Sequence, residues 1–243
     1  MLPSTRTELS DAERSRNQID DLTSLFSALA HEIKNPLSVI HMNLDLLAED
    51  LAEMSTPQAR RAAERVDMVQ QQCARLETLL KDFTKFIRLN KLTLRAGNLN
   101  EQVGQVLDLF HAQAKRQKIE LVRYFDNELP SMLLAPQMMQ AALTNLVKNA
   151  LEAMPEGGQL VARTRPTLRG IALDLIDTGC GMNDETLLKM FNTFYTNKPG
   201  GTGLGLPTAK KIIEAHGGVI NVQSAVGRGT QFTIEFPTPK RLD

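Results

Sequence analysis

The sequence has no tryptophan, few other aromatic residues and no excess of charge of either sign. Aromatic residues make up 5% of the 243 residues, and 28 Lys and Arg residues balance 28 Asp and Glu residues. The broad positive field of a protein that binds nucleic acid or a membrane surface is therefore lacking. Stacking platforms for single-stranded nucleic acid are also disfavoured. We expect no nucleic-acid partner.

Cysteine and long apolar runs are scarce as well. Cys73 and Cys180 lie far apart in the sequence and form no metal-type cluster, so we expect two reduced thiols in a cytoplasmic protein. No apolar run approaches the roughly 18 residues of a spanning helix, so we expect no membrane span. The N-terminus, MLPSTRTELSDAERSRNQ, is too polar for a signal peptide. Because 42% of the residues are apolar and 23% are charged, the composition is that of a globular protein.

Glycine is missing from the first 90 residues, where apolar residues recur in steps of three and four. Met54-Ser55-Thr56-Pro57 interrupts the pattern, and Pro suits the first turn of a second helix. Two long helices with a short link form an antiparallel hairpin. The hairpin cannot bury its seams alone, so we expect a homodimeric four-helix bundle, with docking on the C-terminal domain as the alternative. The seam residues are Ile19, Leu22, Phe26, Leu29, Ile33, Ile40, Leu44 and Leu47, then Ala62, Val66, Val69, Cys73, Leu76, Leu80, Phe83 and Ile87.

After Lys91, glycine, proline and β-branched residues appear, and helical patterns alternate with strand-like ones. The predicted strands are Ile119–Tyr124, Gln159–Thr164, Ile171–Ile176, Val219–Gln223 and Gln231–Phe236, and the predicted helices are Glu101–Gln117, Gln137–Met154 and Thr208–His216. The fold class is therefore α+β and multidomain, a helical hairpin followed by a two-layer α/β sandwich. We expect a polar lead at 1–18, a helical domain at 19–92 and an α/β domain at 93–243.

Four segments carry residues suited to chemistry. The first is HEIKNPL at 31–37. With Phe26 at heptad position a, His31 falls at f and faces solvent. Pro36 removes a helical N–H close to His31 and is expected to kink or loosen the helix. An exposed histidine is by itself usually a surface residue, but a kink beside a His-Glu pair indicates a site that moves or is approached.

The other three segments lie in the C-terminal half. Asn145 and Asn149 share one helix face, and amide oxygens suit a hard cation. Asp177 ends an apolar strand in DTGCGM and can accept a hydrogen bond from an exocyclic amine. The segment KPGGTGLGL at 198–206 opens a helix and presents backbone N–H groups to phosphate. Taken singly, the asparagine pair is better explained as a solvated helix face, and the Asp177 segment fits a simple turn as well as a binding site. The glycine-rich segment is not a dehydrogenase loop, because no βαβ unit is evident, and not a Walker loop, because no Gly-Lys-Ser/Thr follows.

Taken in order, the segments resemble the two-component sensor histidine kinases over about residues 20 to 237. HEIKNPL is similar to the H-box of that family and NLVKNALEA to its N-box. DTGCGM and GGTGLGL resemble its two Gly boxes, FNTFYTNK its F-box, and GRGTQFTIEFP its closing strand. The segment TNKPGGTGLGL resembles the corresponding segment of the nitrogen-regulation-like subgroup. Five motifs in series are far more specific than any one of them.

The resemblance implies a dimerisation and phosphotransfer hairpin, followed by a Bergerat-type ATP-binding domain that uses ATP and Mg²⁺. It implies that His31 is the phosphoacceptor and Glu32 its acid/base partner. Asn149 would be the metal ligand, Asp177 would accept from the adenine amine, and a mobile lid would cover the nucleotide. The other implied nucleotide-site residues are Asn145, Gly179, Gly181, Thr230, the lid anchors Phe191 and Phe194, and the phosphate contacts Lys198, Gly201, Gly203 and Gly205.

One position departs from the family pattern. Many relatives carry a basic residue three positions after the second Asn, where this sequence has Glu152. A phosphate contact is thereby lost, and the role passes to Lys198 or Lys148. The implied partner is the receiver domain of a response regulator, with the input coming from a separate sensory protein or from the rest of a longer chain.

Asn35 lies one helical turn after His31, on the same face. The run Glu32-Ile-Lys-Asn35 also resembles the acidic-x-x-Asn/Thr pattern linked to phosphatase activity toward the regulator. We therefore expect Asn35 to orient a water there. The alternative is that Asn35 only eases the helix into Pro36.

Two other functions fit part of the sequence. An ATP-driven clamp of the chaperone or mismatch-repair kind explains the nucleotide motifs but leaves HEIKNPL unexplained. A degenerate kinase that only binds nucleotide is the other alternative, although every motif is intact by residue type. Acid-labile phosphate on the protein distinguishes a histidine kinase from both.

Overall fold

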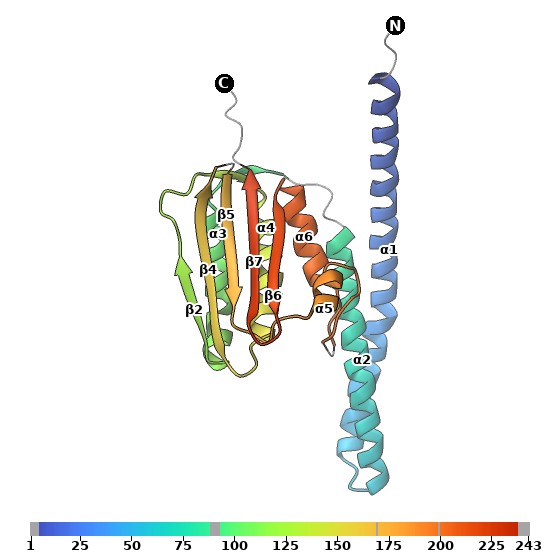
Figure 1. Ribbon diagram of the computed structural model, residues 1–243. Coiled ribbons are helices and arrows are strands. Elements are labelled where there is room, and N and C mark those ends of the chain that lie inside the picture. The colour runs from blue at the N-terminus through green and yellow to red at the C-terminus, as the bar shows by residue number, and fades with distance from the viewer. Residues whose placement is uncertain (1–4, 88–92, 169, 199, 238–243) are drawn as a thin grey trace. The chain divides into compact units, whose positions relative to one another are not determined.

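The computed structural model describes residues 5–87, 93–168, 170–198 and 200–237, with the side chains of residues 5–24, 26 and 27 outside the description. The chain divides into two compact units, Met1–Asn90 and Lys91–Asp243 (Figure 1). The predicted domain boundary after residue 92 lies outside the described residues, as do the side chains of the predicted seam residues Ile19, Leu22 and Phe26. Within the described ranges, no helix has both the length and the apolar character needed to cross a membrane.

The first unit is a hairpin of two long helices, α1 (Thr5–Ala52) and α2 (Pro57–Ile87). The predicted break between them is confirmed. Met54 N–H donates to the Leu51 carbonyl at the end of α1, over 3.2 Å. Thr56 Oγ1 accepts from Ala59 N–H at 3.1 Å. This cap, followed by Pro57 in the first turn, starts α2.

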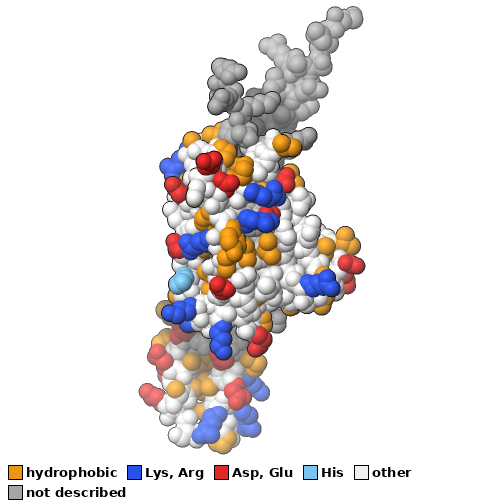
Figure 2. All heavy atoms as spheres, turned by 60° about the vertical axis from the view of Figure 1, so that its left-hand side comes forward, with side chains coloured by type: hydrophobic (Ala, Val, Ile, Leu, Met, Phe, Trp, Pro, Cys, Tyr) orange, Lys and Arg blue, Asp and Glu red, His pale blue; other side chains and the backbone are white. Residues whose placement is uncertain are grey.

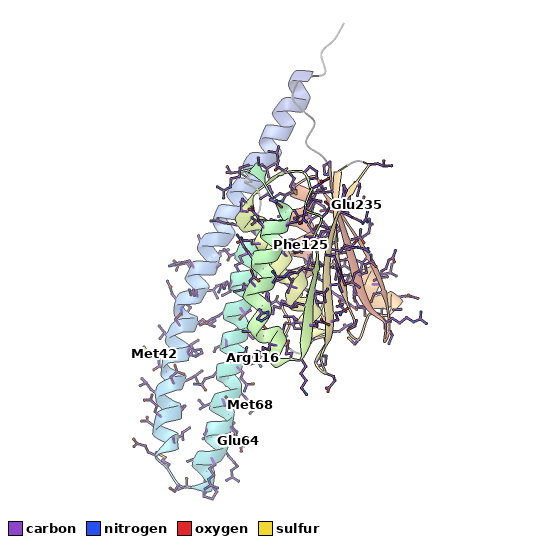
Figure 3. All side chains as sticks on the ribbon, turned by 90° about the vertical axis from the view of Figure 1, so that its left-hand side faces the viewer. Met42, Glu64, Met68, Arg116, Phe125 and Glu235 are labelled. Atoms are coloured by element: carbon purple, nitrogen blue, oxygen red, sulfur yellow. The ribbon has the colours of Figure 1, made fainter. Side chains whose placement is uncertain are left out.

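Apolar residues of the hairpin form two kinds of row with a spacing of seven. One kind packs between α1 and α2, where Leu37, Val66 and Cys73 are buried. The other kind stays on the surface of the hairpin. Its members are 45% to 49% exposed: Ile33, Ile40 and Leu47 on α1, and Val69 and Leu76 on α2. Met42 and Met68 add further exposed apolar side chains (Figure 3). One hairpin therefore leaves part of its heptad seam exposed.

The second unit contains a five-stranded sheet in the order β2-β4-β5-β7-β6. The β2–β4 pair is parallel and the other pairs are antiparallel. The strands are β2 (Ile119–Tyr124), β4 (Gly158–Thr167), β5 (Gly170–Asp177), β6 (Val219–Ala225) and β7 (Gly229–Pro237). A short antiparallel pair, β1 (Arg95–Gly97) with β3 (Met132–Leu134), lies apart from this sheet.

Three helices cover one face of the sheet, as Figure 1 shows: α3 (Leu99–Arg116), α4 (Pro136–Glu152) and α6 (Gly205–Ala215). The core between the layers is made of fully buried aliphatic side chains such as Leu107, Leu143, Leu146 and Leu173. A short helix, α5 (Asp184–Lys189), begins at Asn183, whose side chain accepts from Thr186 N–H. The predicted two-layer α/β architecture is confirmed, and the helices position the residues discussed below.

The uncovered face of the sheet carries a buried carboxylate, Asp174. It accepts hydrogen bonds from Thr233 Oγ1 at 2.9 Å, Arg163 Nη2 at 2.9 Å and Arg165 Nε at 3.3 Å. Burial is the largest single influence on the pKa of Asp174 and would raise it, but these donors together hold the pKa below its ordinary value. Elsewhere on the surface, charges of both signs are interspersed on the face in Figure 2, in keeping with the balanced composition.

Candidate functional site

The predicted phosphoacceptor segment lies on α1, where His31, Glu32 and Asn35 are all exposed while Leu37 is buried. The predicted exposure of His31 is confirmed. The helix continues through Pro36 to Ala52, so the proline does not end it. Because proline has no N–H, the Glu32 carbonyl loses its helical donor. The segment thus has an exposed imidazole next to one weakened helical turn.

Asp177 ends β5 and anchors the second site. Its Oδ1 accepts from Gly179 N–H at 2.9 Å and from Thr230 N–H at 3.1 Å. Thr230 is in place because β7 pairs with β5 and aligns Thr230 opposite Asp177. The Thr230 hydroxyl forms a 3.0 Å hydrogen bond with Ser224 Oγ. The sheet register therefore joins two residues that are 53 positions apart in the sequence.

Asp177 is only 4% exposed. Burial raises its pKa above the ordinary value, against the opposing effects of the two amides and of the Lys198 ammonium. Both hydrogen bonds end on Oδ1, and no donor among the described residues reaches Oδ2. Oδ2 is thus the oxygen that can accept from an exocyclic amine.

Gly179 and Gly181 let the loop after Asp177 pack closely against its neighbours. A Cβ at Gly179 would lie 2.7 Å from the Ala153 carbonyl oxygen. Gly181 has φ +66°, and a Cβ there would lie 2.0 Å from the Ala225 carbonyl oxygen. Cys180 N–H also donates to Ala153 O at 3.0 Å. Gly179 therefore permits the close approach of this loop to the end of α4, and Gly181 its close approach to the end of β6, whatever contacts they make with a ligand.

Helix α4 presents the two asparagines to different partners. A Cβ at Gly205 would lie 3.7 Å from Asn145 Oδ1, so Asn145 faces the start of α6. Asn149 Oδ1 accepts from Lys198 Nζ at 3.0 Å. The same ammonium donates to Glu152 Oε2 at 2.6 Å. These contacts bring the second Gly box and Lys198 to the α4 face that carries both asparagines.

The segment between α5 and α6, described at residues 190–198 and 200–204, is called the α5–α6 loop below. Phe194 has φ +66°, and its N–H donates to Gly203 O at 3.0 Å. A Cβ at Gly203 would come within 2.4 Å of the Phe194 carbonyl carbon, so glycine is required there. Gly201 N–H donates to the Lys198 carbonyl at 3.1 Å, which closes a turn. Phe191 lies under the Lys210 ammonium, 5.1 Å from ring centroid to Nζ.

Sequence reasoning missed His216, which follows α6. Its Nε2 accepts from Ala135 N–H at 2.9 Å, so Nδ1 carries the proton and donates to Ile212 O at 2.7 Å. Burial lowers the pKa of His216, although the Ile212 carbonyl acts in the opposite direction. The contact fixes the start of α4, the helix that bears the asparagines. Nothing local in the sequence marks it, because Ala135 is 81 residues away.

Two family models match the chain. "His Kinase A (phospho-acceptor) domain" matches residues 21–92. "Histidine kinase-, DNA gyrase B-, and HSP90-like ATPase" matches residues 135–240. The chain belongs to the two-component histidine kinases. It therefore carries both domains of an ATP-dependent histidine kinase, the phosphoacceptor and the ATPase domain.

The chain is also similar in sequence and in structure to individual histidine kinases. Sensor histidine kinase ZraS of Salmonella typhi is 32% identical over 96% of the chain, and the chain spans 50% of ZraS. The catalytic domain of histidine kinase ThkA is 31% identical, with a TM-score of 0.56 over 60% of this chain and 97% of that domain. Histidine kinase ThkA in complex with response regulator protein TrrA is 25% identical, with a TM-score of 0.67 over all of this chain and 70% of that one.

Proposed function

We propose that the protein phosphorylates itself on His31 from Mg·ATP and passes the phosphoryl group to an aspartate of a response regulator. One observation carries this function: Asp177 is buried and both of its hydrogen bonds end on Oδ1, which leaves Oδ2 as an acceptor for a ligand amine. A buried acceptor in this arrangement selects a purine with an exocyclic amine. The response-regulator partner is supported by the similarity to ThkA, which was solved in complex with TrrA.

The described residues fit Mg·ATP. Asp177 would hold the adenine, with Gly179, Gly181 and Thr230 keeping its loop in place. Amides near the start of α6, at Gly203 and Gly205, together with Lys198, would meet the phosphates. Asn145 and Asn149 lie on the same α4 face, and Asn149 Oδ1 already holds a cation, the Lys198 ammonium. A magnesium ion bound there would neutralise charge on the phosphates.

His31 supplies the nucleophile. A neutral imidazole has a lone pair on one ring nitrogen, which forms the N–P bond as the bond between the γ-phosphorus and the bridging oxygen of ADP breaks. Glu32 is the proposed acid/base partner, and a hydrogen bond to the other ring nitrogen would orient the ring. Adjacent helix residues do not face each other, so Glu32 must reach around the helix. The weakened turn at Pro36 gives the backbone beside it room to adjust.

The hairpin is proposed to form a homodimer. The exposed row at Ile33, Ile40 and Leu47 and the row at Val69 and Leu76 repeat every seven residues, as a coiled-coil seam requires. A second copy buries both rows in a four-helix bundle. His31 lies off these rows and stays accessible to the ATPase domain and to a receiver domain.

A phosphatase role is proposed for Asn35. It is exposed one turn from His31, and a receiver docked over His31 would place its phosphorylated aspartate near the Asn35 amide. An amide both donates and accepts, which orienting one water requires. In the Asn35→Ala variant, autophosphorylation and phosphotransfer should persist, while regulator dephosphorylation slows by about an order of magnitude or more, the scale of losing one positioned group. A parallel fall in kinase activity would instead assign Asn35 to helix structure.

The kinase itself is tested with His31→Gln. The variant should bind a fluorescent ATP analogue as the wild type does, because His31 lies outside the nucleotide site. It should incorporate no label from γ-labelled ATP. Label retained in His31→Gln would assign the phosphoacceptor to another residue, and failure of the wild type to bind nucleotide would refute the kinase function altogether.

A further inference from the structure

Lys198 joins the α5–α6 loop to two side chains of α4. Its ammonium donates to Asn149 Oδ1 at 3.0 Å and to Glu152 Oε2 at 2.6 Å. Asn149 and Glu152 are three positions apart and share a helix face. On the loop side, Lys198 is held in a turn, because its N–H donates to Thr196 Oγ1 and its carbonyl accepts from Gly201 N–H. This turn fixes the position from which the Lys198 side chain reaches α4.

Glu152 is the charged member of this contact on α4. Its other oxygen, Oε1, lies 3.8 Å from Lys148 Nζ, so the carboxylate sits between two lysines. The Lys198 and Glu152 side chains are 43% and 35% exposed. Exposure on this scale keeps an ion pair weak enough to exchange. The position of Lys198 next to Glu152 therefore depends more on the geometry of the contact than on the strength of the ion pair.

Asn149 Oδ1 is also the oxygen that the proposed function assigns to the metal. Magnesium binds oxygen at about 2.0–2.1 Å. An ammonium 3.0 Å from the same oxygen would then face a divalent cation at very short range. Lys198 and the metal are consequently alternative partners of Asn149, and whatever holds Lys198 in place opposes the metal.

We propose that Glu152 is a positioning residue: it holds Lys198 on Asn149, so that Mg²⁺ must exchange with this lysine when Mg·ATP binds. This inference rests on the proposed function and gives a role to the one N-box position at which the sequence departs from the family pattern. Glu152 raises the Mg²⁺ concentration that the site requires, and it keeps Lys198 next to the phosphates once the metal has displaced it from Asn149.

The direction in which Glu152→Gln shifts the Mg²⁺ requirement separates this role from the alternative that Glu152 attracts or binds the metal itself. If Glu152 retains a competing lysine, Glu152→Gln frees that lysine and lowers the Mg²⁺ requirement. If Glu152 attracts or ligates Mg²⁺ directly, the same variant raises the requirement. Loss of a negative charge alone would also raise it, so a decrease cannot come from electrostatic attraction of the metal.

The experiment is a Mg²⁺ titration of the binding of a fluorescent ATP analogue to the whole chain. A His31→Gln background keeps autophosphorylation from altering the signal. Each curve is scaled to its own plateau, because Lys198→Met also removes a phosphate contact. Glu152→Gln and Lys198→Met should each lower the half-saturating Mg²⁺ concentration by about two- to fivefold, the range expected for an exposed ion pair. The double variant should match Lys198→Met alone.

Two matched controls test for general charge effects. Glu156→Gln removes an exposed carboxylate close to the end of α4, and Lys189→Met removes an ammonium that is paired with Glu185 rather than Glu152. Neither should shift the titration midpoint. An unchanged or raised midpoint in Glu152→Gln, or independent effects that add in the double variant, would overturn the inference while leaving the kinase function intact. Absence of Mg²⁺-dependent nucleotide binding in the parent protein would overturn both.

Discussion

Replacing Asp177 by Asn separates what this residue does for the ligand from what it does for the fold. The asparagine oxygen can still accept from Gly179 N–H and Thr230 N–H, the two donors that now meet Oδ1. An NH₂ group then takes the place of Oδ2. The variant should therefore fold, but it presents a donor where the adenine amine needs an acceptor.

The expected loss of ATP affinity follows from the burial of the site. A hydrogen bond to a charged group contributes about 1.5–3 kcal/mol, which corresponds to about a 10- to 150-fold increase in Kd. GTP carries an acceptor oxygen at the position of the adenine amine, so its binding should weaken less or improve. The ATP-over-GTP preference is thus predicted to narrow in Asp177→Asn.

The stability of Asp177→Asn should not fall together with its ATP affinity. Because the pKa of Asp177 is raised, the folded state holds this proton more tightly than the unfolded state does. The carboxyl therefore favours folding most at pH values below its ordinary pKa of 3.8, and this contribution is lost as pH rises through the raised value. At pH 7 the variant should melt at the same temperature as the wild type or higher, and the difference should shrink in acid.

Calorimetric titration with ATP and GTP, together with thermal unfolding between pH 3.5 and about 7, measures all of these quantities. Wild-type ATP affinity in Asp177→Asn would refute the assignment of Oδ2 to the adenine amine. A large drop in the melting temperature at pH 7 would refute the account of the buried charge.

Three further changes test other parts of the molecule. Leu76→Glu puts a charge into the proposed dimer seam at a cost of several kilocalories per mole, so this variant should sediment as a monomer or unfold. The control variant Met68→Glu changes a residue off the seven-residue rows and should stay dimeric. Asn149→Asp should lower the autophosphorylation rate about tenfold or more; an unchanged rate and metal dependence would make Asn149 a surface residue. His216→Ala leaves Ala135 N–H without its acceptor and should cost about 1–3 kcal/mol. Because the pKa of His216 is lowered, the wild type should lose more stability than the variant as pH falls below about 6.5, which thermal unfolding of both proteins measures.

Sequence periodicity predicted the elements better than their ends. The strand at Ile119–Tyr124 matched at both ends, whereas β4 runs on past the predicted Thr164 to Thr167 and includes Pro166. Pro166 is tolerated because β2 pairs with β4 only as far as Arg163, so β4 is an edge there. The strands β1 and β3 have three residues each, too few for alternation to reveal.

In the candidate site, too, some features could be predicted from the local sequence and others could not. Local spacing placed His31 on the exposed side of its helix and the two asparagines on one face of another. The contacts of Asp177 with Thr230, of Lys198 with Glu152 and of His216 with Ala135 join residues far apart in the sequence. Pairing order and helix packing create these contacts, and no local pattern encodes them. Family resemblance indicated Thr230 and Lys198 but gave no reason to expect His216.

Mapping the phosphorylated residue after incubation with γ-labelled ATP and Mg²⁺ tests the central claim most directly. The phosphate should be labile in acid, stable in alkali and located on His31 by peptide mass spectrometry. An acid-stable phosphate on a serine, threonine or tyrosine, or wild-type protein that binds ATP and never becomes labelled, would contradict the assignment of this chain as a working histidine kinase.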